Sequence, residues 1–137
     1  MNSLFSNAVG LIIMRLGLVA LFLWFGISQV LHPDQWTAWI PAWTSQLPLT
    51  QIQIIYANGG FEILFGLLLF LGLWTRFVAA LLALHLFFIA FEVGYNDIGV
   101  RDFALGMCTL AMAIFGPDKY SLSRKMPQAV PPPKPLF

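Results

Sequence analysis

The residues of this chain best suited to chemistry are ionisable side chains inside long apolar runs. Arg15, Glu62 and Glu92 lie in such runs, and His85 lies seven residues before Glu92. An ionisable side chain in hydrocarbon costs at least about 2.5–3.5 kcal/mol, even on lenient insertion scales. Such residues therefore face the interior of a helix bundle and pair there, and they are candidates for proton or substrate chemistry.

The polar residues of each run recur on one face of a helix, mostly at heptad spacing. Residues seven apart on a helix share a face, so each helix would carry its polar groups on one stripe. Four such stripes facing a common axis would form a bundle with a polar core. The positions concerned are Arg15, Phe22 and Gln29; Gly59, Glu62 and Gly66; His85 and Glu92; and Arg101 and Cys108.

A rise of 1.5 Å per residue places Arg15, Glu62, His85 and Cys108 at one level, roughly 12–16 Å from the inner ends of their helices. We therefore predict an Arg15–Glu62 ion pair with His85 nearby. The small residues beside Glu62 would let another helix approach closely.

A second polar level is expected near the outer face, where Arg101 would be matched by Glu92 or Asp102, with Gln29 at the same depth. Pairing removes the desolvation problem of each partner, whereas a lone buried charge would be severely destabilising. These four residues are the predicted substrate-binding group, and Arg15, Glu62 and His85 are the predicted catalytic group.

Each of these groups has a structural alternative. The Arg15–Glu62 pair could act in substrate or proton binding, or only fix the register of two helices. His85 could carry protons, because imidazole titrates near neutral pH, or it could be a hydrogen-bonded packing residue. A haem site is disfavoured, because His32 lies at the outer boundary. Cys108 is expected to be a small packing residue, and the phenylalanines and methionines to face lipid or core, or to line a quinone site.

Composition indicates an integral membrane protein. The chain has 137 residues, of which 59% are hydrophobic and 9% charged, with a mean hydropathy of +0.81. A net charge of +1 argues against nucleic acid as a partner, because binding phosphates needs a basic face. Cys108 is the only cysteine, which excludes an internal disulfide, a CxxC pair and a cysteine-based metal site within one chain. No metal site and no covalently bound cofactor are predicted.

Four apolar runs predict an all-α, antiparallel four-helix bundle in the membrane, because a chain this apolar must satisfy its backbone within its own segments. The predicted spans are residues 7–31, 50–73, 77–95 and 102–115. Arg76 and the four basic residues after Asp118 place both termini in the cytoplasm. We divide the chain into a transmembrane domain, residues 1–118, and a basic, proline-rich cytoplasmic tail, residues 119–137.

The loop between the first two spans is rich in tryptophan. Trp36, Trp39, Ile40 and Trp43 recur at helical spacing. Tryptophan is common at membrane surfaces, so this loop is read as an interfacial anchor. The alternative is a hydrophobic lid or docking platform.

Three motifs in order resemble the DoxX family of small bacterial inner-membrane proteins. They are Arg15-Leu16-Gly17 with the following LFLWFG; Glu62-Ile63-Leu64-Phe65-Gly66 continuing to Trp74-Thr75-Arg76; and Arg101-Asp102-Phe103-Ala104-Leu105 leading to Gly116-Pro117-Asp118 and Tyr120-Ser121-Leu122. The resemblance implies four transmembrane helices and redox work at the membrane. DoxD-type relatives resemble subunits of thiosulfate:quinone oxidoreductase, and others associate with thiol or oxidative-stress enzymes. One departure is Gln29, where many relatives have a lysine.

The resulting expectation is a membrane subunit of a redox system that engages quinone or anchors a partner oxidoreductase. The sequence shows no flavin motif, metal cluster or cysteine pair, so a partner or a bound quinone would have to carry electrons. Two alternatives stay open. One is a small-solute or proton-coupled transporter acting as a homo-oligomer, and the other is a purely structural scaffold in the lipid bilayer.

Overall fold

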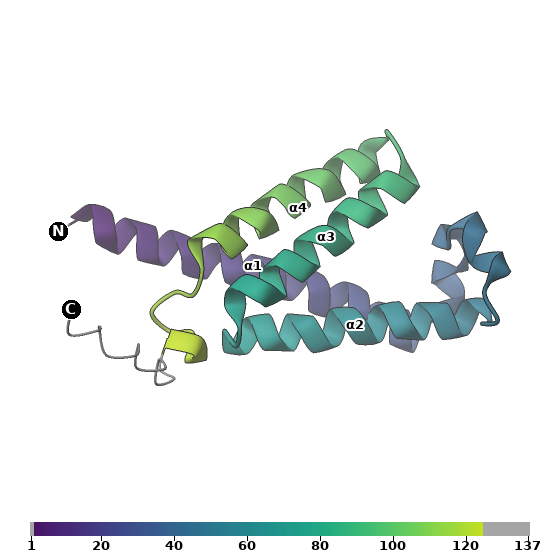
Figure 1. The fold of residues 1–137 in the computed structure, drawn as a ribbon, viewed down its shortest axis with the longest axis horizontal. Coiled ribbons are helices and arrows are strands. Elements are labelled where there is room, and N and C mark those ends of the chain that lie inside the picture. The colour runs from purple at the N-terminus through teal and green to yellow at the C-terminus, as the bar shows by residue number, and fades with distance from the viewer. Residues whose placement is uncertain (1, 125–137) are drawn as a thin grey trace, which may run out of the picture.

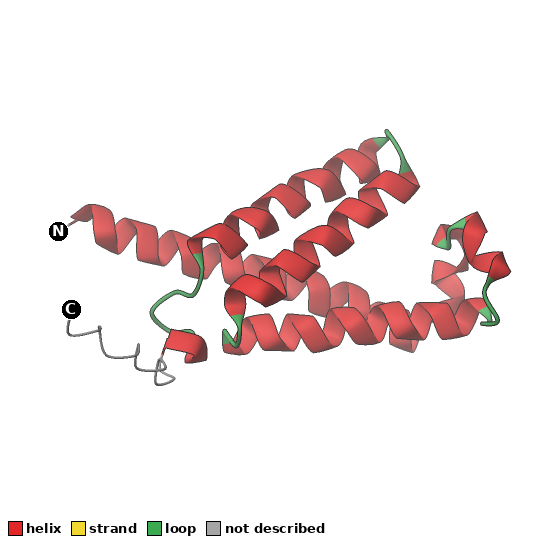
Figure 2. Ribbon diagram, viewed as in Figure 1, coloured by secondary structure: helices red, strands yellow, loops and turns green. Residues whose placement is uncertain are grey.

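The computed structural model describes residues 2–124, and all regular elements in that range are helical (Figure 2). The predicted all-α fold is therefore confirmed. Four long α-helices are accompanied by three short 3₁₀-helices. In chain order these elements are α1 Asn2–Leu31, η1 Pro33–Trp39, η2 Ala42–Gln46, α2 Gln51–Leu71, α3 Thr75–Val93, α4 Asp97–Phe115 and η3 Leu122–Arg124.

All four α-helices are long and apolar enough to cross a membrane. Many of their large apolar side chains lie on the outer surface of the bundle; Trp24, for example, is 73% exposed and Phe91 is 82% exposed. Such exposure would be costly in water, whereas hydrocarbon is a favourable surrounding for these side chains. The predicted number of spans is confirmed.

Local capping explains where two of the helices begin. Thr50 and Gln53 form a capping box at the start of α2, with Gln53 N donating to Thr50 Oγ1 over 3.2 Å. Asn96 caps α4 by accepting from the amides of Ile98 and Gly99, both over 3.0 Å. The prediction that the fourth span begins at Asp102 was wrong, because this cap starts the helix at Asp97.

The helices form two antiparallel hairpins, α1 with α2 and α3 with α4, which diverge from one another towards one end of the molecule (Figure 1). The divergent end holds η1, η2 and the α3–α4 turn, and we call it the loop end. The opposite end holds the α2–α3 turn and residues 116–124, and we call it the clamp end. The start of α1 and η3 both lie at the clamp end.

Glycines set the register of the first hairpin. A Cβ on Gly59 would lie 2.9 Å from the carbonyl oxygen of Gly26, and a Cβ on Gly26 would lie 2.8 Å from that of Gly59. Backbones this close leave no space for a side chain. The predicted close approach beside Glu62 is therefore confirmed, and the helix that approaches is α1.

The apolar core lies between Glu62 and the clamp end. Its buried members come from all four helices and exclude solvent from the middle of the bundle. They are Leu18, Val19, Phe22, Leu69, Val78, Ala79, Leu82, Leu86 and Met112.

The first residues of the predicted tail contact the helices. Ser123 donates to the carbonyl oxygen of Gly72 from its amide, over 3.0 Å, and from its hydroxyl, over 2.6 Å. Gly72 has φ = 67° at the end of α2, and Ser121 lies against it. The remainder of the tail, residues 125–137, lies outside the described residues.

Candidate functional site

A cavity of about 420 Å³ lies between the two hairpins, towards the loop end. This volume is within the range of small-molecule sites, about 300–1,000 Å³. All four helices and η1 contribute to it, and most of the lining side chains are apolar. The lining residues are Leu21, Phe22, Phe25, Gln29, Trp36, Trp39, Ile40, Pro41, Ile54, Ile55, Asn58, Glu62, His85, Leu86, Phe88, Ile89, Glu92, Val93, Ile98, Arg101 and Asp102.

Glu62 is the centre of a hydrogen-bond network on the cavity wall. Its Oε2 accepts from Gln29 Nε2 over 3.0 Å, and its Oε1 accepts from Asn58 Nδ2 over 3.3 Å. His85 Nε2 lies 3.0 Å from the same Oε1. Asn58 also donates to Gln29 Oε1 over 2.8 Å, so the two amides hold each other as well as the carboxylate. The network joins α1, α2 and α3 at one level.

The carboxylate determines which histidine nitrogen carries a proton. An ionised Glu62 can only accept, so its contact with His85 requires the hydrogen to lie on Nε2. Nδ1 then stays available to a ligand, because within residues 2–124 it has no hydrogen-bond partner. The predicted proximity of His85 to Glu62 is confirmed, and the pair can hold one exchangeable proton beside the cavity.

A second polar group lies nearer the loop end. Arg101 contacts Asp102 Oδ1 from both Nε and Nη2, each over 2.8 Å, which confirms the predicted match between them. The guanidinium also lies over the Phe25 ring, 5.8 Å from its centroid. Glu92 lines the same cavity but forms no ion pair or hydrogen bond with any residue in the described range.

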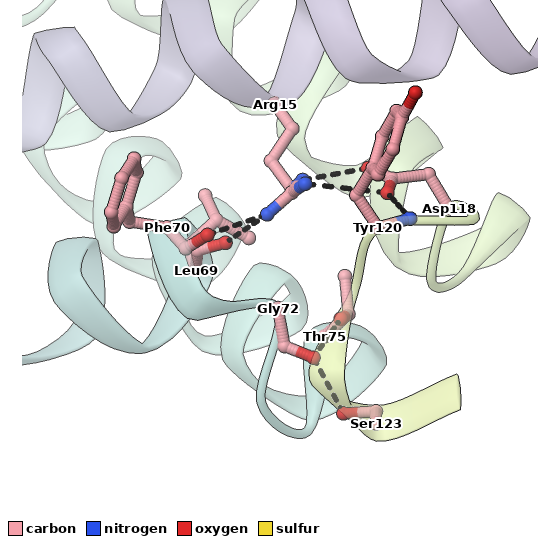
Figure 3. Close-up of polar contacts among 8 residues, drawn as sticks. All are labelled: Arg15, Leu69, Phe70, Gly72, Thr75, Asp118, Tyr120 and Ser123. Atoms are coloured by element: carbon pink, nitrogen blue, oxygen red, sulfur yellow. Dashed lines mark hydrogen bonds and ion pairs between the residues drawn. The ribbon is translucent and has the colours of Figure 1, made fainter. Parts of the chain in front are cut away.

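The predicted Arg15–Glu62 pair was wrong. Arg15 instead binds Asp118, with Nε 2.7 Å from Oδ2 and Nη2 3.2 Å from Oδ1 (Figure 3). Its Nη1 donates to the carbonyl oxygens of Leu69 and Phe70 over 3.2 and 2.6 Å. Those carbonyls belong to the last turn of α2, where carbonyls lack donors from a following turn of helix, and the Leu69 oxygen also accepts from the Gly72 amide over 3.1 Å. Arg15 therefore closes the clamp end and does not line the cavity.

The register of α1 against α2 explains this error. Gly26 faces Gly59, so Gln29 reaches Glu62, whereas Arg15 reaches the end of α2 at Leu69 and Phe70. Arg15 thus lies about 11 Å from Glu62 along the helix axis. The prediction took residue 7 as level with the inner end of the second span, whereas Arg15 itself is level with the last turn of α2. It also placed Gln29 with Arg101 rather than with Glu62.

Cys108 is exposed, so the prediction that it packs inside the bundle on an interior-facing polar stripe was wrong. The buried face of α4 contains Gly99, Asp102, Gly106 and Thr109. Cys108 is seven residues from Arg101 and shares the outer side of the helix with it, not the buried side.

The tryptophan-rich loop covers part of the cavity. Trp36, Trp39 and Ile40 line it, and Trp43 lies edge-on to Phe88 of α3, with ring centroids 6.2 Å apart. Trp36 also packs edge-on against Phe25 at 5.6 Å. These contacts favour the lid interpretation, while Trp39 and Trp43 keep about half of their surface exposed at the loop end.

Sequence reasoning missed two residues of these networks. Asn58 lies one helical turn before Glu62, a spacing that brings side chains together and could have indicated the contact. Asp118 directly follows the Gly116-Pro117 break, where a carboxylate is expected to face solvent. In the structure it is buried and paired with Arg15. Within residues 2–124, no group of three His, Cys, Asp or Glu side chains is arranged to hold a metal ion.

A family model for DoxX matches residues 10–94, which is more than half of the chain. The chain belongs to the DoxX family. It is therefore a multi-pass membrane protein of the DoxX type, as the ordered motifs indicated. The matched range contains Glu62 and His85 but ends before Arg101 and Asp102. Searches of curated proteins and of solved structures gave no significant match.

Proposed function

We propose that this DoxX protein binds quinone in the cavity between its hairpins and serves as a membrane subunit of a bacterial redox system. The observation that carries the proposal is the Glu62–His85 pair on the wall of a largely apolar cavity. Quinones combine an apolar ring and tail with carbonyl oxygens that take up protons on reduction. A site for them needs apolar walls together with a few donors.

The hydrogen-bond network supports a role for His85 as the proton-exchanging group. Gln29 and Asn58 hold the Glu62 carboxylate, and the carboxylate holds His85 Nε2. A protonated His85 would donate from Nδ1 to a quinone carbonyl oxygen. Gln29 and Asn58 are thus positioning residues rather than proton carriers.

Reduction of a quinone to the quinol takes two electrons and two protons. In this proposal the electrons come from a partner oxidoreductase, and at least one proton passes through His85. In this proposal the partner binds at the cytoplasmic surface of the inner membrane. The basic residues Arg76, Lys119 and Arg124 favour an orientation in which the clamp end lies on that side. A buried core separates the cavity from the clamp end, and its Leu82 and Met112 side chains are fully covered. This core opposes proton exchange between the cavity and the clamp end.

The proposal is tested by analysing the lipophilic molecules that purify with the protein in mild detergent, followed by titration with a short-chain quinone. We expect quinone to co-purify with the wild type and the titration to quench Trp36 and Trp39 fluorescence saturably. Glu62→Gln and His85→Leu should lower both signals. Cys108→Ala, at an exposed position, is the matched control.

Two results would overturn the proposal. One is the absence of saturable quinone binding by a folded wild-type protein. The other is a pair of findings: flux of a small solute in proteoliposomes depends on Glu62, and the wild type binds quinone no more tightly than Glu62→Gln and His85→Leu do. The second result would favour the transporter alternative.

A further inference from the structure

The charges around the cavity do not balance. The lining contains three carboxylates, from Glu62, Glu92 and Asp102, and one guanidinium, from Arg101. Asp102 is matched by Arg101 at 2.8 Å, and Glu62 is bound by two amides and His85. With His85 neutral the lining has a net charge of −2, and with His85 protonated the net charge is −1. A negative potential of this kind attracts cations and repels anions.

One of these excess charges, the one on Glu92, lies at the loop end. Glu92 lines the cavity from the last turn of α3, and no residue in the range 2–124 forms an ion pair or hydrogen bond with its carboxylate. It is exposed, in contrast to Glu62 and Asp102, which are 4% and 6% exposed. A ligand that reached the cavity from the loop end would therefore meet an unmatched carboxylate.

Aromatic side chains line the same cavity as Glu92. Phe25, Trp36 and Trp39 contribute to its wall, and Phe88 lies four residues before Glu92 on α3. Aromatic faces attract cations within about 6 Å of the ring centroid, and quaternary ammonium ions are held by such walls. The chain already places a cation here, because the Arg101 guanidinium lies 5.8 Å from the Phe25 centroid.

We infer that the loop-end half of the cavity binds amphipathic organic cations, with Glu92 as the counter-ion and Phe25, Trp36 and Trp39 as the aromatic contacts. The ligand class is an ammonium centre carrying an apolar or aromatic group. This activity goes beyond quinone binding and does not depend on it. The same charges disfavour small anions, so an anionic electron donor would bind elsewhere.

The test uses three probes of similar size: benzyltrimethylammonium, its neutral carbon isostere neopentylbenzene, and the anion benzenesulfonate. The full chain is titrated with each probe by calorimetry in an uncharged detergent. We expect saturable binding of the cation, at least about tenfold tighter than of either other probe, which corresponds to about 1.4 kcal/mol.

Glu92→Gln should weaken cation binding about tenfold. Asp97→Asn is the matched control, because Asp97 is an exposed acid in the first turn of α4 that does not line the cavity. Both substitutions are at exposed positions, so the variants are expected to fold.

Equal affinity for the cation and the anion would overturn the inference. So would a Glu92→Gln variant that binds the cation as tightly as Asp97→Asn. Neither result bears on quinone, because these probes have no carbonyl group and the readout depends on Glu92 rather than on Glu62 and His85.

Discussion

The Arg15–Asp118 contact gives the sharpest test of the helix register. Its two charged side chains are 6% and 1% exposed and are joined by two contacts, of 2.7 and 3.2 Å. Removing one partner of a buried ion pair leaves an uncompensated charge and costs about 3–5 kcal/mol. Arg15→Gln and Asp118→Asn should each lower the free energy of unfolding by about 3 kcal/mol, near the lower limit of this range. Arg15 keeps the carbonyls of Leu69 and Phe70, and Asp118 is also bound by the amide of Tyr120 over 2.8 Å.

The double variant leaves neither charge unpaired, so it should lose less stability than the two single variants together. We expect a coupling energy of about 1.5–3 kcal/mol, at the upper end for residues in contact. The assay is unfolding in mixed micelles with increasing sodium dodecyl sulfate, followed by tryptophan fluorescence and circular dichroism.

A second cycle provides the control. Arg15→Gln and Glu62→Gln should be additive within about 0.5 kcal/mol, because the two side chains contact different residues at different depths. Additivity in the Arg15–Asp118 cycle, or strong coupling in the Arg15–Glu62 cycle, would refute the register described here.

Three further predictions concern the α1–α2 contact, access to the cavity and the lid. Gly59→Ala should destabilise the protein by about 1–3 kcal/mol in the same unfolding assay, since its Cβ would overlap the α1 backbone; Gly60→Ala, with nothing within 4 Å of its Cβ, should be neutral or stabilising. In a Cys108→Ala background that keeps Glu92, Val93→Cys, on the cavity wall, should react with a water-soluble maleimide, and benzyltrimethylammonium should slow the reaction; no slowing would place the ligand elsewhere. Trp36→Ala should weaken short-chain quinone binding several-fold, measured by calorimetry, and unchanged affinity would exclude a lid role for this side chain.

Much of the fold could be predicted from apolar runs and breaks. The run lengths predicted four helices, and Gly116-Pro117 predicted the end of the last one. The start of α4 was not predicted, because Asn96 and Asp97 are typical of loops and also of helix N-termini. Only the side-chain geometry of the Asn96 cap distinguishes the two.

Most polar residues of the cavity were predicted, although Arg15 was included wrongly and Asn58 was missed, and their pairing was predicted only in part. Heptad spacing selected His85 and Arg101, which line the cavity with Glu62, but it also selected Arg15 and Cys108, which do not. Pairing requires the axial register of two helices, which the Gly26–Gly59 contact determines. The sequence alone does not give the position of one helix along the axis of another. Arg15 was therefore paired with the carboxylate at the nearest estimated depth, Glu62, rather than with Asp118.

The central claim is that quinone binds beside the Glu62–His85 pair, and photolabelling with an azidoquinone tests it most directly. The account predicts that labelled peptides come from the cavity lining in residues 21–41 or 85–93, and that Glu62→Gln reduces this labelling. Labelling spread over the lipid-facing side chains, with equal yield in wild type and Glu62→Gln, would contradict it.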